Sequence, residues 1–62
     1  MRGMIWLHQH KSPILVNPDQ IETVFPSTDE GWPGSYIYFQ GEEDPIHVDE
    51  DMETIDRKVR LS

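Results

Sequence analysis

The chain contains no cysteine, so neither a disulfide nor a thiolate-bound metal cluster can stabilise it. With 62 residues it is expected to form one small domain, in which residues 1–3 are a flexible extension. The hydrophobic core of so short a chain provides only a small net stability. Good packing or a partner chain is therefore needed for a stable fold. The absence of cysteine fits a cytoplasmic protein.

Long apolar runs are also absent, and no stretch approaches the ~20 residues that a membrane-spanning helix needs. The first seven residues begin like a signal peptide, but His8 and His10 end that apolar stretch too early. We therefore expect no membrane partner.

Basic residues are scarce: five Lys and Arg stand against twelve Asp and Glu, for a net charge of −7. Direct binding to nucleic acid is not expected, because phosphate contacts depend on Lys and Arg. The acids crowd into residues 42–56. This run has two interpretations, a solvated surface or a docking face for a basic partner protein. The acids of the run are Glu42, Glu43, Asp44, Asp49, Glu50, Asp51, Glu53 and Asp56.

Alternating apolar and polar residues predict short strands joined by turns, with a hairpin turn at Lys11 and Ser12. A helix is expected from about Glu50 to Leu61. Consecutive short strands favour an antiparallel meander. We expect an α+β fold, a small curved antiparallel sheet of four or five strands with one C-terminal helix packed on it. The predicted strands are residues 4–10, 13–17, 21–25, 35–40 and 45–48.

The charges along the C-terminal segment are typical of a helix. Asp49, Glu50 and Asp51 are predicted to cap and complement its N-terminus, and the basic residues from Arg57 onward suit its C-terminus. One face of this helix is apolar and should cover the sheet. The expected core is Ile5, Leu7, Ile14, Val16, Val24, Ile37, Phe39, Ile46, Val48, Met52, Ile55 and Val59.

No motif for catalysis or for a cofactor is present, so we expect a non-enzyme without cofactor or metal. His8, His10 and His47 could converge on zinc if their strands were adjacent, but their spacing matches no zinc signature. The acidic clusters lack the spacing of a calcium loop.

Exposed aromatic residues and one acidic turn are the candidate partner-binding residues. Trp32, in a long loop, either covers the core or forms a binding hot spot. The other aromatics are predicted to line the second face of the sheet, which together with an open sheet edge would promote self-association. The candidates are Trp6, Trp32, Tyr36, Tyr38, Glu42, Glu43 and Asp44.

The order of these segments resembles the small FlbD-type proteins, which are associated with flagella and swarming motility and have similar short counterparts in phages and mobile elements. The resemblance spans residues 4–59, and residues 16–24 (VNPDQIETV) are its most specific part. It implies the strand–turn–strand layout and carries over no catalytic residue. The long loop around Trp32 and the two exposed tyrosines depart from the pattern.

The predicted function is a non-enzymatic protein-interaction or regulatory accessory module that forms homo-oligomers. The alternative is an acidic mimic of nucleic acid that binds a basic protein partner. Salt would weaken the binding of such a mimic steeply.

Overall fold

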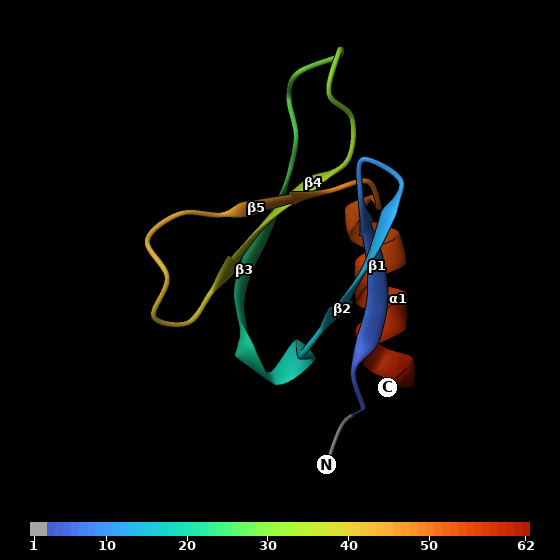
Figure 1. Ribbon diagram of the computed structural model, residues 1–62, viewed down its shortest axis with the longest axis vertical. Helices are drawn as coiled ribbons and strands as arrows, with labels where there is room; N and C mark the ends of the chain where they lie inside the picture. Colours follow the sequence, from blue (N-terminus) through green and yellow to red (C-terminus); the bar gives the residue numbers. More distant parts are fainter. Residues whose placement is uncertain (1–2) are drawn as a thin grey trace.

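The structure, a computed structural model, describes residues 3–62. Five strands precede one helix (Figure 1), which confirms the α+β fold with antiparallel strand pairs and a C-terminal helix. Of the predicted extension, residues 1 and 2 lie outside the described part, and Gly3 is exposed. The elements are β1 (Ile5–Gln9), β2 (Ser12–Val16), the 3₁₀ turn η1 (Pro18–Gln20), β3 (Ile21–Pro26), β4 (Ser35–Phe39), β5 (Ile46–Val48) and α1 (Met52–Leu61).

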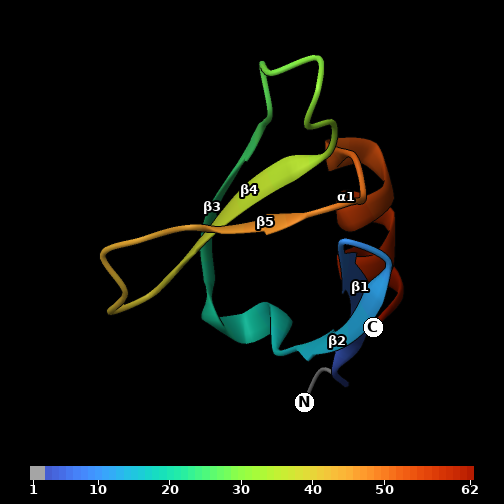
Figure 2. The same ribbon diagram turned by 45° about the horizontal axis from the view of Figure 1, so that its top comes forward.

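The strands do not form one sheet, and this part of the prediction is wrong. They form a two-stranded sheet, β1–β2, and a three-stranded sheet, β3–β4–β5. The cause is η1, which turns the chain away between β2 and β3 (Figure 2). Asn17 caps it by accepting the Asp19 N–H at 3.0 Å, and its first residue, Pro18, is buried.

The hairpin of β1 and β2 turns at His10 and Lys11, one residue earlier than predicted. Both residues have positive φ, 50° and 69°, as a two-residue hairpin turn requires. Gln9 and Ser12 then flank the turn as a hydrogen-bonded pair, so His8 and its partner Pro13 form a non-hydrogen-bonded pair. The backbone nitrogen of Pro13 therefore faces the free edge of β2. Because it carries no hydrogen, it cannot donate to a further strand at this edge.

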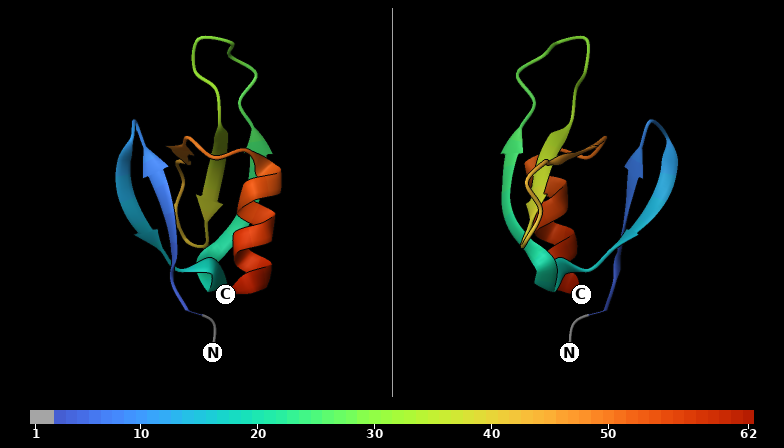
Figure 3. Two further views of the ribbon diagram at one scale, coloured as in Figure 1. Left: turned by 90° about the vertical axis from the view of Figure 1, so that its right-hand side faces the viewer. Right: turned by 60° about the vertical axis from the view of Figure 1, so that its left-hand side comes forward.

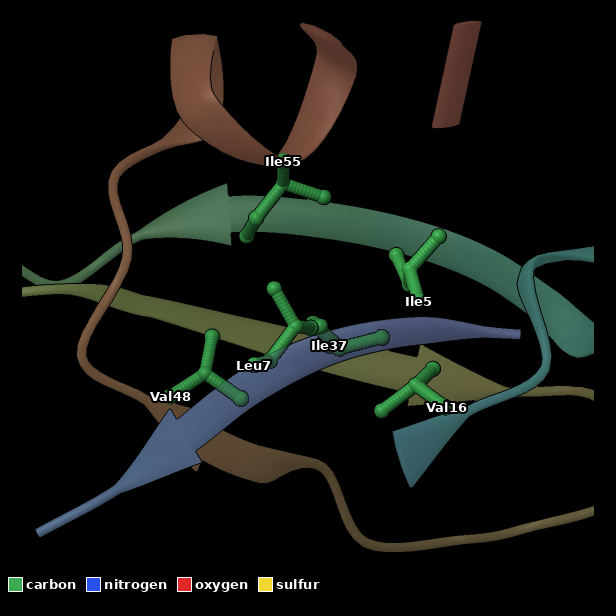
Figure 4. Packing of buried hydrophobic residues seen from close by; sticks show 6 residues of the cluster. All are labelled: Ile5, Leu7, Val16, Ile37, Val48 and Ile55. Atoms are coloured by element: carbon green, nitrogen blue, oxygen red, sulfur yellow. The ribbon is translucent and has the colours of Figure 1, made fainter. Parts of the chain in front are cut away.

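The core lies between the two sheets and α1 (Figure 4). Its six buried hydrophobic residues come from β1, β2, β4, β5 and α1. Met52 was predicted to join them but is 43% exposed, because the first turn of α1 lies at the rim of the core. Ile21 packs against the core instead. The buried residues are Ile5, Leu7, Val16, Ile37, Val48 and Ile55.

The approach of β5 to the start of β4 fixes where α1 can begin. Gly34 has φ +118°, and a Cβ on it would lie 2.1 Å from the carbonyl oxygen of Val48. Next to it, the buried Ser35 hydroxyl donates to the Glu50 carbonyl at 2.8 Å. These two contacts hold the chain between β5 and α1 against β4.

No helix among residues 3–62 has the length and apolarity to cross a membrane.

Candidate interaction surfaces

The outer edge of β1 is closed by acids that follow β5. Glu50 accepts the His8 N–H through Oε1 at 2.9 Å, and His8 Nδ1–H donates to Glu50 Oε2 at 2.6 Å. Asp49 N–H donates to the His8 carbonyl at 2.7 Å. Because the Glu50 side chain is only 11% exposed, its bonds to His8 are shielded from water. No strand of the three-stranded sheet pairs with β1. The bonds from the segment after β5 connect the two sheets at this edge instead.

Asp49 also binds the hairpin turn. Its Oδ2 accepts the Lys11 N–H at 2.8 Å and its Oδ1 accepts the His10 N–H at 3.2 Å. The bond from Lys11 is the main cause of a pKa of Asp49 below its ordinary value, with His10 and the nearby imidazole of His47 adding to it against an opposing effect of desolvation. The ionised form of Asp49 therefore stabilises the turn.

Only one of the three acids predicted to cap α1 does so. Asp51 is the N-cap, and its Oδ1 accepts the Thr54 N–H at 2.8 Å. The hydroxyl and N–H of Thr54 hold the pKa of Asp51 below its ordinary value. Asp49 and Glu50 bind the hairpin instead, so the helix begins at Met52, two residues later than predicted.

The outer face of the hairpin is apolar and exposed. Trp6 and Leu15 are opposite each other across β1 and β2, and they are 57% and 48% exposed. Met4, which precedes β1, is 49% exposed. We call these three residues the hairpin patch. Because Ile5, Leu7 and Val16 fill the inner face, this two-stranded sheet presents apolar side chains on both faces.

The hairpin itself carries no acidic residue, although acids from other segments border it. Residues 1–18 contain no Asp or Glu, so all twelve acids follow the hairpin in sequence. The Lys58 ammonium donates to the Trp6 carbonyl at 2.7 Å and lies at the edge of the patch. The acid-free N-terminal stretch is visible in the sequence as the counterpart of the acid-rich run at residues 42–56, but it was not predicted to matter.

The other predicted aromatics do not join Trp6. Tyr36 and Tyr38 belong to the three-stranded sheet, so the three rings do not share one sheet face. Tyr38 contacts the ring of Phe25 with centroids 5.3 Å apart. The exposed indole of Trp32 lies against His10, with centroids 4.3 Å apart, rather than over the core.

The three histidines also separate. His8 is bound to Glu50, whereas the rings of His10 and His47 lie 6.0 Å apart near Trp32. Among residues 3–62, no group of three or more His, Cys, Asp or Glu side chains could hold a metal ion. His47 Nε2 donates to the Pro33 carbonyl at 2.8 Å, and its buried Nδ1 has no partner in the same part of the chain.

The acidic turn between β4 and β5 is fully accessible. Glu42, Glu43 and Asp44 are exposed, and their side chains make no hydrogen bond or ion pair within residues 3–62, where the Glu42 N–H donates to the Phe39 carbonyl at 3.1 Å. Their carboxylates therefore take no visible part in holding the fold together. They remain candidates for contact with a partner.

A second apolar surface lies between α1 and β3. The groove has a volume of about 520 Å³ and an apolar floor, and the carboxylates of Glu53 and Asp56 stand on its helical side. Arg60 Nε binds the Asp56 carboxylate at 2.9 Å, and Glu53 has no ion pair within residues 3–62. We call this surface the α1–β3 groove. Its principal apolar residues are Ile21, Val24, Met52 and Val59.

The fold and these surfaces define a small α+β protein with two antiparallel sheets, one terminal helix and two separate apolar surfaces. Comparison with protein-family models, with curated proteins and with solved structures returns no match for the chain.

Proposed function

We propose that this chain is a non-enzymatic protein-interaction module that associates with copies of itself through the hairpin patch. The observation that carries the proposal is the exposure of Trp6 and its cross-strand partner Leu15 on a hairpin without acids. A monomer of this size gains stability by covering such a patch. The hairpin strands themselves add no negative charge to such a contact, although Asp49, Glu50 and the turn at residues 42–44 border them.

The polar side chains near the hairpin are engaged in holding the fold, which supports a non-enzymatic role. The bonds of His8, Asp49 and Glu50 close the edge of β1 and the hairpin turn. These bonds give the three residues a structural role. We place the protein in the cytoplasm, in keeping with its lack of cysteine. The regulatory accessory role, and the association with flagella and swarming motility that the resemblance to FlbD-type proteins implies, stay predictions, which the neighbouring genes would test.

Sedimentation velocity over a range of concentrations tests the proposal. Between about 10 μM and about 1 mM the weight-average mass should rise above that of one chain. Trp6→Gln should shift this rise to higher concentration, because tryptophan is a frequent hot spot of protein contacts. A chain that stays monomeric throughout this range would contradict self-association.

The second candidate function is the acidic mimic of nucleic acid, and the exposed carboxylates of Glu42, Glu43 and Asp44 favour it. Neutralising these three residues to Gln and Asn should abolish capture of a basic nucleic-acid-binding protein, and added salt should do the same. Binding that survives both changes would exclude the mimic.

A further inference from the structure

The hairpin patch and the α1–β3 groove complement each other. The patch exposes the large apolar side chains of Trp6 and Leu15 beside the Lys58 ammonium, and the groove is a hollow apolar surface beside Glu53 and Asp56. We propose that the groove of one copy receives the hairpin patch of another. This inference rests on the proposed self-association and names the surface that receives the patch.

Charge favours this pairing over contact between two hairpin patches. Two facing patches would bring two Lys58 ammonium groups to the same interface, whereas the groove offers the carboxylate of Glu53, which has no ion pair within residues 3–62. Opposite charges beside an apolar contact fix its register and suppress wrong partners. The volume of the groove, about 520 Å³, lies within the range of about 300–1,000 Å³ typical of binding pockets.

The position of the two surfaces determines how the assembly grows. Both views in Figure 3 place the hairpin on one side of the molecule and β3 on the other. A pair of copies joined by patch and groove therefore leaves one patch and one groove unoccupied. Such a head-to-tail contact continues into larger oligomers or closes into a ring, whereas contact between two patches stops at a dimer.

Two variants separate the surfaces. Trp6→Gln removes the main side chain of the patch and keeps the groove intact. The double variant Met52→Gln/Glu53→Gln alters the groove and keeps the patch, and both positions are exposed in the first turn of α1. Leu61→Gln is the matched control, because Leu61 is an apolar residue of the same helix that is 80% exposed and does not line the groove. Each of the two test variants should weaken self-association roughly tenfold or more, and the control should not.

Mixing the two test variants gives the decisive result. Alone, each is expected to sediment as a monomer at a concentration where the wild type associates. An equimolar mixture should form pairs containing one copy of each variant and should stop there, because the only intact patch and the only intact groove are then occupied. Circular dichroism melts of each variant, and Leu15→Gln as a second patch variant, confirm that the effect is not a loss of folding.

Two outcomes would overturn the inference. In the first, the groove variant associates as strongly as the wild type while Trp6→Gln does not, which points to contact between two patches and leaves the proposed function intact. In the second, the mixture of folded variants stays monomeric. A wild type that never associates would remove the proposed function itself.

Discussion

Asp49 holds the turn of the hairpin from outside, with its Oδ2 accepting the backbone N–H of Lys11 at 2.8 Å. Lys11 has a φ of 69°, a conformation that residues other than glycine adopt at some cost. The carboxylate satisfies two turn N–H groups at once and offsets this cost. The acidic segment after β5 therefore replaces the Asn-Gly sequence that such a turn usually requires.

Asp49→Ala should destabilise the protein, because the His10 and Lys11 N–H groups lose their acceptor. We expect a fall of several degrees in the midpoint of thermal unfolding, measured by circular dichroism. Asp44→Ala, an exposed acid in the β4–β5 turn, is the control and should leave the midpoint nearly unchanged. Equal midpoints for the two variants would show that Asp49 does not support the turn.

Acid should weaken the fold in a defined range of pH. The pKa values of Asp49 and Asp51 are lowered in the folded protein from the ordinary value of 3.8. Their contribution to the free energy of unfolding is therefore complete above that value and is lost as the pH falls through the lower folded-state pKa. Denaturant unfolding at about pH 5 and about pH 2.5 measures this loss, and Asp49→Ala should show a smaller difference between the two. An unchanged difference would assign the acid sensitivity to other groups.

Gly34→Ala should be among the most damaging single substitutions. The new Cβ would have to displace the Val48 backbone, and alanine would also have to adopt the φ of +118°. We expect a loss of about 3 kcal/mol or more in the free energy of unfolding. Gly41→Ala is the matched control, because Gly41 also has positive φ but has no atom within 4 Å of the new Cβ. It should cost only about 1–2 kcal/mol, and a similar loss at both positions would contradict the close approach of β4 and β5.

Ser35→Ala isolates one buried hydrogen bond. The Ser35 hydroxyl is fully buried and donates to the Glu50 carbonyl, so its removal should cost about 1–2 kcal/mol in the free energy of unfolding. Ser62→Ala removes an exposed hydroxyl that donates to the Val59 carbonyl, and it should cost less than about 0.5 kcal/mol. If both variants unfold at the same denaturant concentration, the Ser35 bond does not anchor the start of α1.

The local elements could be predicted from the sequence because they depend on neighbouring residues. The alternation in residues 35–39 and the apolar spacing of Ile55 and Val59 place β4 and α1 nearly as observed. The division into two sheets could not be predicted in this way. It depends on η1 turning the chain away after β2, and a turn signal such as Asn17-Pro18 does not specify whether the next strand pairs with the previous one.

The roles of Asp49 and Glu50 were hidden for a related reason. In sequence they directly precede a helix, where acids usually cap, and their actual partners His8 and Lys11 lie about forty residues away. Local rules favour the nearest unsatisfied N–H groups. Once β5 runs beside β1, the edge of β1 offers its own N–H groups and takes these two carboxylates.

The most direct test of self-association follows the two tryptophan side chains separately by NMR. The indole N–H signals of Trp6 and Trp32 are resolved in one spectrum of the ¹⁵N-labelled protein, recorded from about 10 μM to about 1 mM. We predict that the Trp6 signal shifts with concentration, because Trp6 enters the contact between copies, and that the Trp32 signal does not. Signals that stay constant for both residues, or a shift of Trp32 alone, would contradict association through the hairpin patch.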